Sequence, residues 1–187
     1  DLAVVSHLAT LESKIPFLHF FDGFRTSHSI QKIIPMSYDE LKDMLDMKYV
    51  EEFRALALRP EAPMCKVGAQ NPDVYFQGRE TVNKYYDACP GIVKKYMKLF
   101  AEKTGRNYKL YEYIGAPDAD KIIIAMGSAT ETIEETINYL TKKGERVGLL
   151  KLRLYRPFDV EDFIHEIPGS VKKIVVLDRT KEPGAIG

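Results

Sequence analysis

The spacing of hydrophobic residues changes along the chain, and its first part predicts a helix followed by one aromatic strand. Residues 2–12 carry apolar side chains at positions 2, 4, 5, 8, 9 and 11, the spacing of a helix buried over most of its width. Residues 15–21 are mostly apolar and aromatic, which predicts a strand that ends at the Asp22-Gly23 break. His19 lies inside this segment, so we expect it to be packed in the core.

The middle of the chain is predicted to be helical, with one irregular connection. Helices are expected at about residues 38–47, 48–58, 81–88 and 91–103. Ser37 and Glu40 form a capping box at the start of the first of these. Pro90 is expected to separate the last two helices, and Gly105 to end the second in a left-handed conformation. Residues 64–78 have no clean period, which predicts an ordered but irregular connection.

The last third alternates between apolar strands and helices. Strands are expected at residues 108–114, 121–126, 146–154 and 171–177, and helices at 132–143 and 159–167. The first of these strands, at the edge, precedes a turn-rich linker at 115–120, and Ser128 with Glu131 is a second capping box. The α/β alternation after this linker predicts a parallel sheet covered on both faces, with right-handed crossovers.

Composition narrows the classes of protein without selecting one. Among 187 residues, 27 are Lys or Arg and 27 are Asp or Glu, so the basic excess typical of proteins that bind nucleic acid or an anionic membrane is missing. No apolar run approaches the roughly 20 residues of a membrane span. Cys65 and Cys89 are expected to be free thiols in a reducing cytosol, with a disulfide as the alternative. Two cysteines cannot hold an iron–sulfur cluster.

Asp22, Arg25 and His28 are the first candidate for a functional site. They are spaced three residues apart directly after the predicted aromatic strand, so they share one face if the segment is helical. Arg25 could clamp a carboxylate or phosphate, and His28 could titrate near neutral pH. The alternative is a salt-bridged turn that docks the segment on a neighbouring domain.

Gly127 and Ser128 are a second, weaker candidate, for cofactor binding. They lie between an apolar strand and a helix N-terminus, where free N–H groups and the helix dipole favour an anion. The remaining glycines of a dinucleotide fingerprint are missing, so ordinary capping by Ser128 is the alternative. Charged residues also follow two strands and predict an interface edge or a ligand site: Arg153, Tyr155, Arg156, Asp178, Arg179, Lys181 and Glu182.

Five segments in register resemble those of one known family, the pyruvate:ferredoxin (flavodoxin) oxidoreductases. Residues 20–28 (FFDGFRTSH) and 68–80 (GAQNPDVYFQGRE) are similar to a stretch late in the first domain of these enzymes. Similarity to the second domain lies, in the family's order, at residues 126–135, 152–158 and 177–185. Ser29-Ile30 is a departure, because relatives often have an acidic residue after His28.

The resemblance implies an enzyme that uses thiamine diphosphate and Mg²⁺ in the oxidative decarboxylation of pyruvate to acetyl-CoA and CO₂. Electrons would pass through iron–sulfur clusters to ferredoxin or flavodoxin, and the acetyl group to coenzyme A. The enzyme would be a cytoplasmic homodimer. Residues 1–105 should then close a first, pyrimidine-binding-like domain, and residues 106–187 should begin a transketolase-C-like second domain.

The same resemblance implies a structural role for this piece. The residues that activate thiamine and hold pyruvate should lie before Asp1, and the cluster ligands and most coenzyme A contacts after Gly187. We therefore expect the fragment to be inactive, to bind no cofactor alone, and to partner the remaining domains of the enzyme. The alternative is a packing and dimerisation module of another 2-oxoacid:ferredoxin oxidoreductase.

Overall fold

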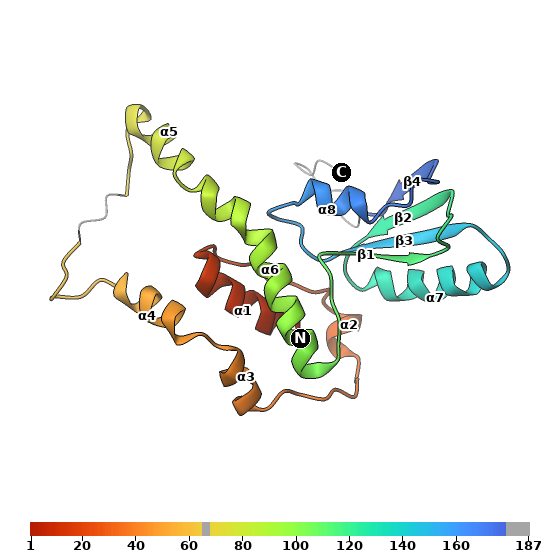
Figure 1. Cartoon of the computed structure of the whole chain (residues 1–187), viewed down its shortest axis with the longest axis horizontal. Helices are drawn as coiled ribbons and strands as arrows, with labels where there is room; N and C mark the ends of the chain where they lie inside the picture. The colour runs from red at the N-terminus through yellow and green to blue at the C-terminus, as the bar shows by residue number, and fades with distance from the viewer. Residues whose placement is uncertain (65–67, 179–187) are drawn as a thin grey trace. The chain divides into compact units, whose positions relative to one another are not determined.

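The computed structural model describes residues 1–64 and 68–178, and the chain divides into two compact units (Figure 1). The first unit comprises Asp1–His19 and Ile34–Asn107. The second comprises Phe20–Ile33 and Tyr108–Gly187. A short segment from early in the chain thus belongs to the later unit, which the hydrophobic pattern did not indicate.

The first unit is helical. Its helices are α1 (Leu2–Ser13), α3 (Tyr38–Met44), α4 (Met47–Ala55), α5 (Pro72–Glu80) and α6 (Asn83–Thr104). Helix α1 packs along α6, and the residues buried on these two helices include Leu8, Ala9, Val93 and Phe100. The Tyr96 hydroxyl of α6 donates to Glu12 Oε2 of α1 at 2.6 Å, which adds a polar contact beside this core.

Two predictions about helix ends in this unit are confirmed. The Glu40 N–H donates to Ser37 Oγ at 3.2 Å and the Ser37 N–H donates to Glu40 Oε2 at 2.7 Å, so the capping box forms. Gly105 follows α6 with a φ of +72°, and its N–H donates to the Ala101 carbonyl at 2.8 Å. Both ends depend on local chemistry, which the sequence contains in full.

Four predictions for the first 105 residues are wrong. Residues 15–21 form no strand, and His19 is exposed, because no described strand pairs with this segment and composition alone cannot supply a ladder partner. Pro90 lies inside α6 instead of between two helices, where its burial against the core outweighs the lost hydrogen bond. Residues 72–80 are helical rather than irregular, with Pro72 in the first turn.

The second unit is built on one four-stranded sheet. Its strands are β1 (Tyr111–Gly115), β2 (Lys121–Ala125), β3 (Val147–Leu152) and β4 (Lys173–Val176), and its helices are α2 (Arg25–His28), α7 (Ala129–Lys142) and α8 (Val160–His165). The strand order is β1-β3-β2-β4. Strands β3 and β4 both pair in parallel with β2, and β1 pairs antiparallel at the edge. The mixed α/β class, the parallel arrangement and the edge strand are therefore confirmed.

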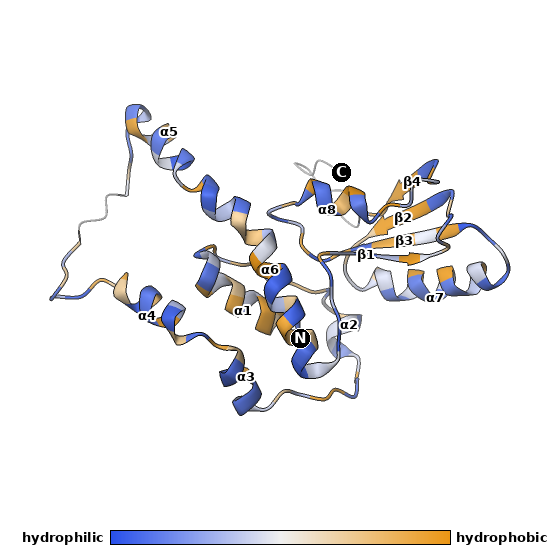
Figure 2. Ribbon diagram, in the orientation of Figure 1, coloured by the Kyte–Doolittle hydropathy of each residue, from blue (hydrophilic) through white to orange (hydrophobic). Residues whose placement is uncertain are grey.

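The helices α7 and α8 cover opposite faces of this sheet (Figure 1). Ala125, Ile137 and Leu149 form a buried cluster where α7 packs on β2 and β3. Tyr111 is in register with Leu152, on the other face, and packs against Phe163 of α8 with ring centroids 5.2 Å apart. Figure 2 shows that β2 is apolar over most of its length, as expected for a strand covered on both faces.

Candidate functional site

The carboxyl ends of β2 and β3 define the place where a ligand site is expected in this unit. The chain leaves β2 toward α7 on one face and leaves β3 toward α8 on the other. Two neighbouring parallel strands whose connections go to opposite faces form a topological switch point, where open α/β sheets bind ligands. Gly127 and Ser128 follow β2 at this point, and Arg153 follows β3.

The structure brings two of the predicted candidates together at the start of α7. The Ser128 N–H donates to Asp22 Oδ2 at 2.6 Å, although the two residues are 106 positions apart in sequence. Gly127 has a φ of +76°, and a Cβ built on it would lie 2.8 Å from the same carboxylate oxygen. The N–H of the N-cap residue thus faces a protein carboxylate, whose negative charge opposes the binding of a diphosphate at this point.

The predicted capping box at this helix is wrong. Ser128 makes no side-chain cap hydrogen bond, and the Thr130 hydroxyl donates instead to the Gly127 carbonyl at 2.8 Å. Glu131 does not turn back to Ser128, because its Oε1 accepts a hydrogen bond from Lys151 Nζ at 3.0 Å. A charged partner on the neighbouring strand therefore outcompetes the local capping contact.

Arg25 and His28 lie on the four-residue helix α2, so the condition under which their spacing puts them on one face is met. His28 Nδ1 lies 2.6 Å from the Phe24 carbonyl oxygen, a contact that requires the proton on Nδ1. Both side chains are exposed, and among the described residues no ion pair joins Arg25 to an acidic group. Of the three candidates, only Asp22 is thus seen to bond with the sheet.

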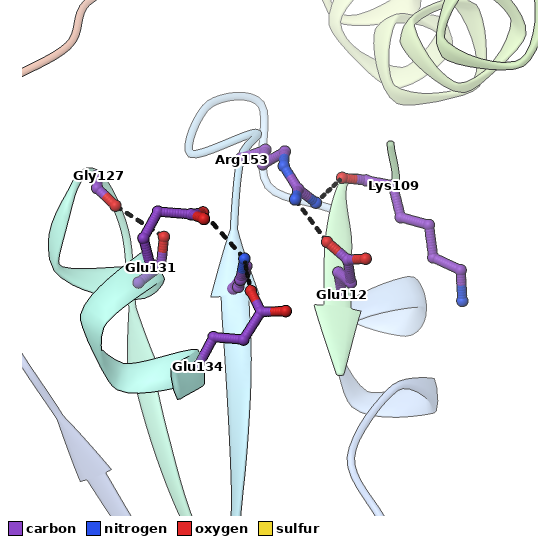
Figure 3. A network of polar contacts seen from close by, with 8 residues as sticks. Lys109, Glu112, Gly127, Glu131, Glu134 and Arg153 are labelled. Atoms are coloured by element: carbon purple, nitrogen blue, oxygen red, sulfur yellow. Dashed lines mark hydrogen bonds and ion pairs between the residues drawn. The ribbon is translucent and has the colours of Figure 1, made fainter. Parts of the chain in front are cut away.

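Lys151 is a buried charged residue that sequence reasoning missed. Its side chain is 7% exposed, it lies in β3, and its Nζ contacts Glu131 and Glu134 of α7. Burial alone would lower the pKa of Lys151, but the hydrogen bonds with Glu134 and Glu131 outweigh it and hold that pKa above its ordinary value. Figure 3 shows both glutamates on α7 turned toward β3. Two acids three apart on a helix, facing a lysine within an apolar strand, were the available signal.

Arg153 forms a third ion pair at the same edge of the sheet. Its guanidinium bonds to Glu112 of β1, and its Nη1 donates to the Lys109 carbonyl at 3.3 Å (Figure 3). Of the charged edge predicted after β3 and β4, Arg179, Lys181 and Glu182 lie outside the described residues. The ion pairs at this edge, including the two of Lys151, link α7, β3 and β1 to one another.

No metal-binding group is found within residues 1–64 and 68–178, since no three His, Cys, Asp or Glu side chains are placed to hold an ion. Burial raises the pKa of the Cys89 thiol even though it shares a hydrogen bond with Ser13, so this thiol is a poor nucleophile. Among the helices of the described segments, none has the length and apolar character that a membrane crossing requires. The described site therefore consists of ion pairs and one helix cap.

Both parts of the chain match models of one class of redox enzyme. Residues 1–98 match the family described as pyruvate flavodoxin/ferredoxin oxidoreductase, thiamine diphosphate-binding. Residues 119–187 match the family described as pyruvate:ferredoxin oxidoreductase core domain II. The chain therefore belongs to the pyruvate:ferredoxin/flavodoxin oxidoreductase family, as the five matching segments indicated.

Individual relatives agree with this assignment. The chain is 56% identical over 187 residues to the pyruvate:ferredoxin oxidoreductase of Moorella thermoacetica, covering all of this chain and 16% of the relative. It is 53% identical over the same length, and with the same coverage, to a pyruvate-flavodoxin oxidoreductase of Nostoc sp.. A solved 2-oxoglutarate:ferredoxin oxidoreductase from Magnetococcus marinus is 20% identical with a TM-score of 0.43, over 63% of this chain and 19% of that chain, a likeness too low to carry an argument. The chain thus spans about a sixth of the length of the curated relatives.

Proposed function

We propose that this chain is a supporting part of an enzyme that oxidatively decarboxylates pyruvate to acetyl-CoA and CO₂. Ferredoxin or flavodoxin would accept the electrons. The observation that carries the proposal is the hydrogen bond between Asp22 and the Ser128 N–H. Asp22 lies in the part that matches the thiamine diphosphate-binding model, and Ser128 in the part that matches core domain II. The residue that best resembled a ligand contact thus joins two parts of the enzyme.

The chemistry of the reaction indicates that the cofactors are bound mainly by the rest of the enzyme and that this chain supports its structure. Thiamine diphosphate supplies the carbanion stabilisation that decarboxylation needs, and each iron–sulfur cluster needs several cysteine thiolates. The chain has only Cys65 and Cys89. The clusters would accordingly be held by other parts of the polypeptide. From the family resemblance we expect the same of most contacts to thiamine diphosphate, Mg²⁺ and coenzyme A, and this chain would contribute packing within a homodimer.

The domain division belongs to the same proposal, with residues 1–105 ending a thiamine-enzyme-like domain and 106–187 beginning a transketolase-C-like one. It is supported by the two family matches, which end at residue 98 and resume at residue 119. The break between the two compact units at Asn107 and Tyr108 also lies in this interval. A second 2-oxoacid as substrate is the competing candidate, and the substrate pocket that would decide between the two is expected in another part of the enzyme.

The alternative to a support role is that Arg25 and His28 contribute to an active site that other domains of the enzyme complete. Both are exposed on α2, and a guanidinium can clamp the carboxylate of a 2-oxoacid. A support role predicts that Arg25→Ala in the complete enzyme leaves the KM for pyruvate and the thiamine diphosphate requirement unchanged, because no substrate contact is lost. Steady-state kinetics at varied pyruvate and cofactor concentrations measure both quantities.

Arg54→Ala is the matched control for that experiment, because Arg54 is an exposed arginine on α4, in the first unit. If Arg25→Ala raises the KM for pyruvate about tenfold while the enzyme still assembles as the control does, Arg25 contacts substrate and the support role is wrong. If Arg25→Ala and Arg54→Ala have the same KM for pyruvate and the same thiamine diphosphate requirement, a substrate contact by Arg25 is rejected.

A further inference from the structure

The segment Phe20–Ile33 lies with the sheet unit, but apolar burial contributes little to holding it there. Phe20, Phe21 and Phe24 are 65%, 70% and 80% exposed. Exposed aromatic rings gain little free energy from contact with the sheet unit, since that gain scales with the area removed from water. A directional polar contact is therefore the stronger means of fixing the position of this segment.

We propose that Asp22 caps the start of α7 from a distant part of the chain, by accepting the N–H of the N-cap residue Ser128, and that this contact fixes the segment Phe20–Ile33 on the sheet. Asp22 is then a positioning residue. The four N–H groups at a helix N-terminus have no partner within the helix, and Asp is among the residues that satisfy them best. Its negative charge also interacts favourably with the helix dipole at this end.

No other described side chain near the start of α7 makes the capping contact that Asp22 makes. Ser128 precedes the helix but makes no side-chain cap hydrogen bond. Glu131 lies in the first turn, yet its carboxylate is taken by Lys151. The helix therefore begins without either contact of its own capping box, and the Asp22 carboxylate, 2.6 Å from the Ser128 nitrogen, takes the place that Glu131 has in such a box.

Gly127 is the residue that admits the carboxylate. Its φ of +76° lies in the left-handed region, and a Cβ there would approach Asp22 Oδ2 to 2.8 Å. A real Cβ needs more room than this, so any other residue would push the carboxylate away from the Ser128 N–H. Gly144 has a φ of +87° but nothing within 4 Å of an added Cβ. An alanine at this position therefore introduces backbone strain without the steric overlap, and serves as the control.

Amide hydrogen exchange of the full 187-residue chain, followed by NMR, tests the proposal. Asp22→Ala should accelerate exchange of the Ser128 amide about fivefold, the loss expected for one capping hydrogen bond. Asp22→Asn keeps an acceptor oxygen and should restore most of the protection. Asp118→Ala removes another carboxylate of the same unit, one that pairs with Arg146 at 3.0 Å, and should leave the Ser128 amide unchanged.

A double-mutant cycle keeps the proposal testable if one variant is too unstable for NMR assignment. Gly127→Ala should lower the protection of α7 amides more than Gly144→Ala does, and this excess should disappear in the Asp22→Ala background. An excess of the same size in both backgrounds would overturn the proposal. So would Ser128 exchange that is as slow in Asp22→Ala as in the unchanged chain.

Discussion

Glu131→Gln combined with Glu134→Gln is expected to destabilise the sheet unit by about 3 kcal/mol, far more than Lys151→Met does. The double substitution leaves a buried ammonium without a charged partner, since the Lys151 side chain is only 7% exposed. Lys151→Met leaves two glutamates that water can solvate, because their side chains are 77% and 30% exposed. Its cost should therefore stay within about 1 kcal/mol. Hydrogen exchange of the β3 amides measures both free energies of opening.

The pH dependence of these variants provides an internal check. The pKa of Lys151 is raised in the folded chain, so its ion pairs stabilise the fold fully below the unfolded pKa of about 10.4 and less as pH rises through the folded pKa. In the double-glutamine variant the penalty should instead shrink as pH approaches that value, because the unfolded lysine then also loses its proton. Equal costs for Lys151→Met and the double variant at neutral pH would contradict this account of the ion pairs.

Gly115→Ala is expected to destabilise the same unit by about 2–5 kcal/mol, the sum of backbone strain and steric overlap. Gly115 has a φ of +135°, and a Cβ there would lie 2.5 Å from the Val147 carbonyl oxygen and 2.6 Å from Gly148 Cα. Both are backbone atoms of the segment paired with β1, so they cannot rotate away. Urea unfolding followed by tyrosine fluorescence measures the change.

Gly144→Ala is the control for Gly115→Ala. It places an alanine at a φ of +87° with open space around the new methyl group, so only strain of about 1–2 kcal/mol is expected. If the two variants cost the same, the close approach of β1 and β3 at Gly115 does not constrain the sheet. If Gly115→Ala costs more by the expected margin, the register of Gly115 with Gly148 is confirmed as a tight contact.

Strands β2 and β3 were predictable because they are buried by their own sequence neighbours, whereas β4 is exposed along its length. The apolar runs that became β2 and β3 are covered by α7, which directly connects them, so local pattern and tertiary environment agree. The strand predicted at residues 15–21 was wrong because a strand needs a neighbouring strand to pair with, and none pairs with this segment among the described residues. The approach of Asp22 to Ser128 spans 106 positions, which no local period can indicate.

The candidate site residues also show which contacts a sequence pattern cannot predict. The spacing of Asp22, Arg25 and His28 puts them on one face only if the segment is helical, and Arg25–His28 is a helix, but spacing cannot say what a carboxylate will face. Lys151 was passed over because a lysine in a strand usually reaches solvent, whereas the strand register places it beside Ala125 on the face that α7 covers. Family resemblance supplied the enzyme class, and only the fold showed that Asp22 contacts the protein itself.

The most direct test of the support role compares the complete oxidoreductase with the isolated 187-residue chain in one assay. Each is supplied with pyruvate, coenzyme A, thiamine diphosphate and Mg²⁺, and the reduction of ferredoxin or a viologen dye is followed spectroscopically. The account predicts pyruvate-dependent reduction by the complete enzyme and none by the isolated chain, even when circular dichroism shows that chain to be folded. Pyruvate-dependent turnover by the isolated chain would contradict it.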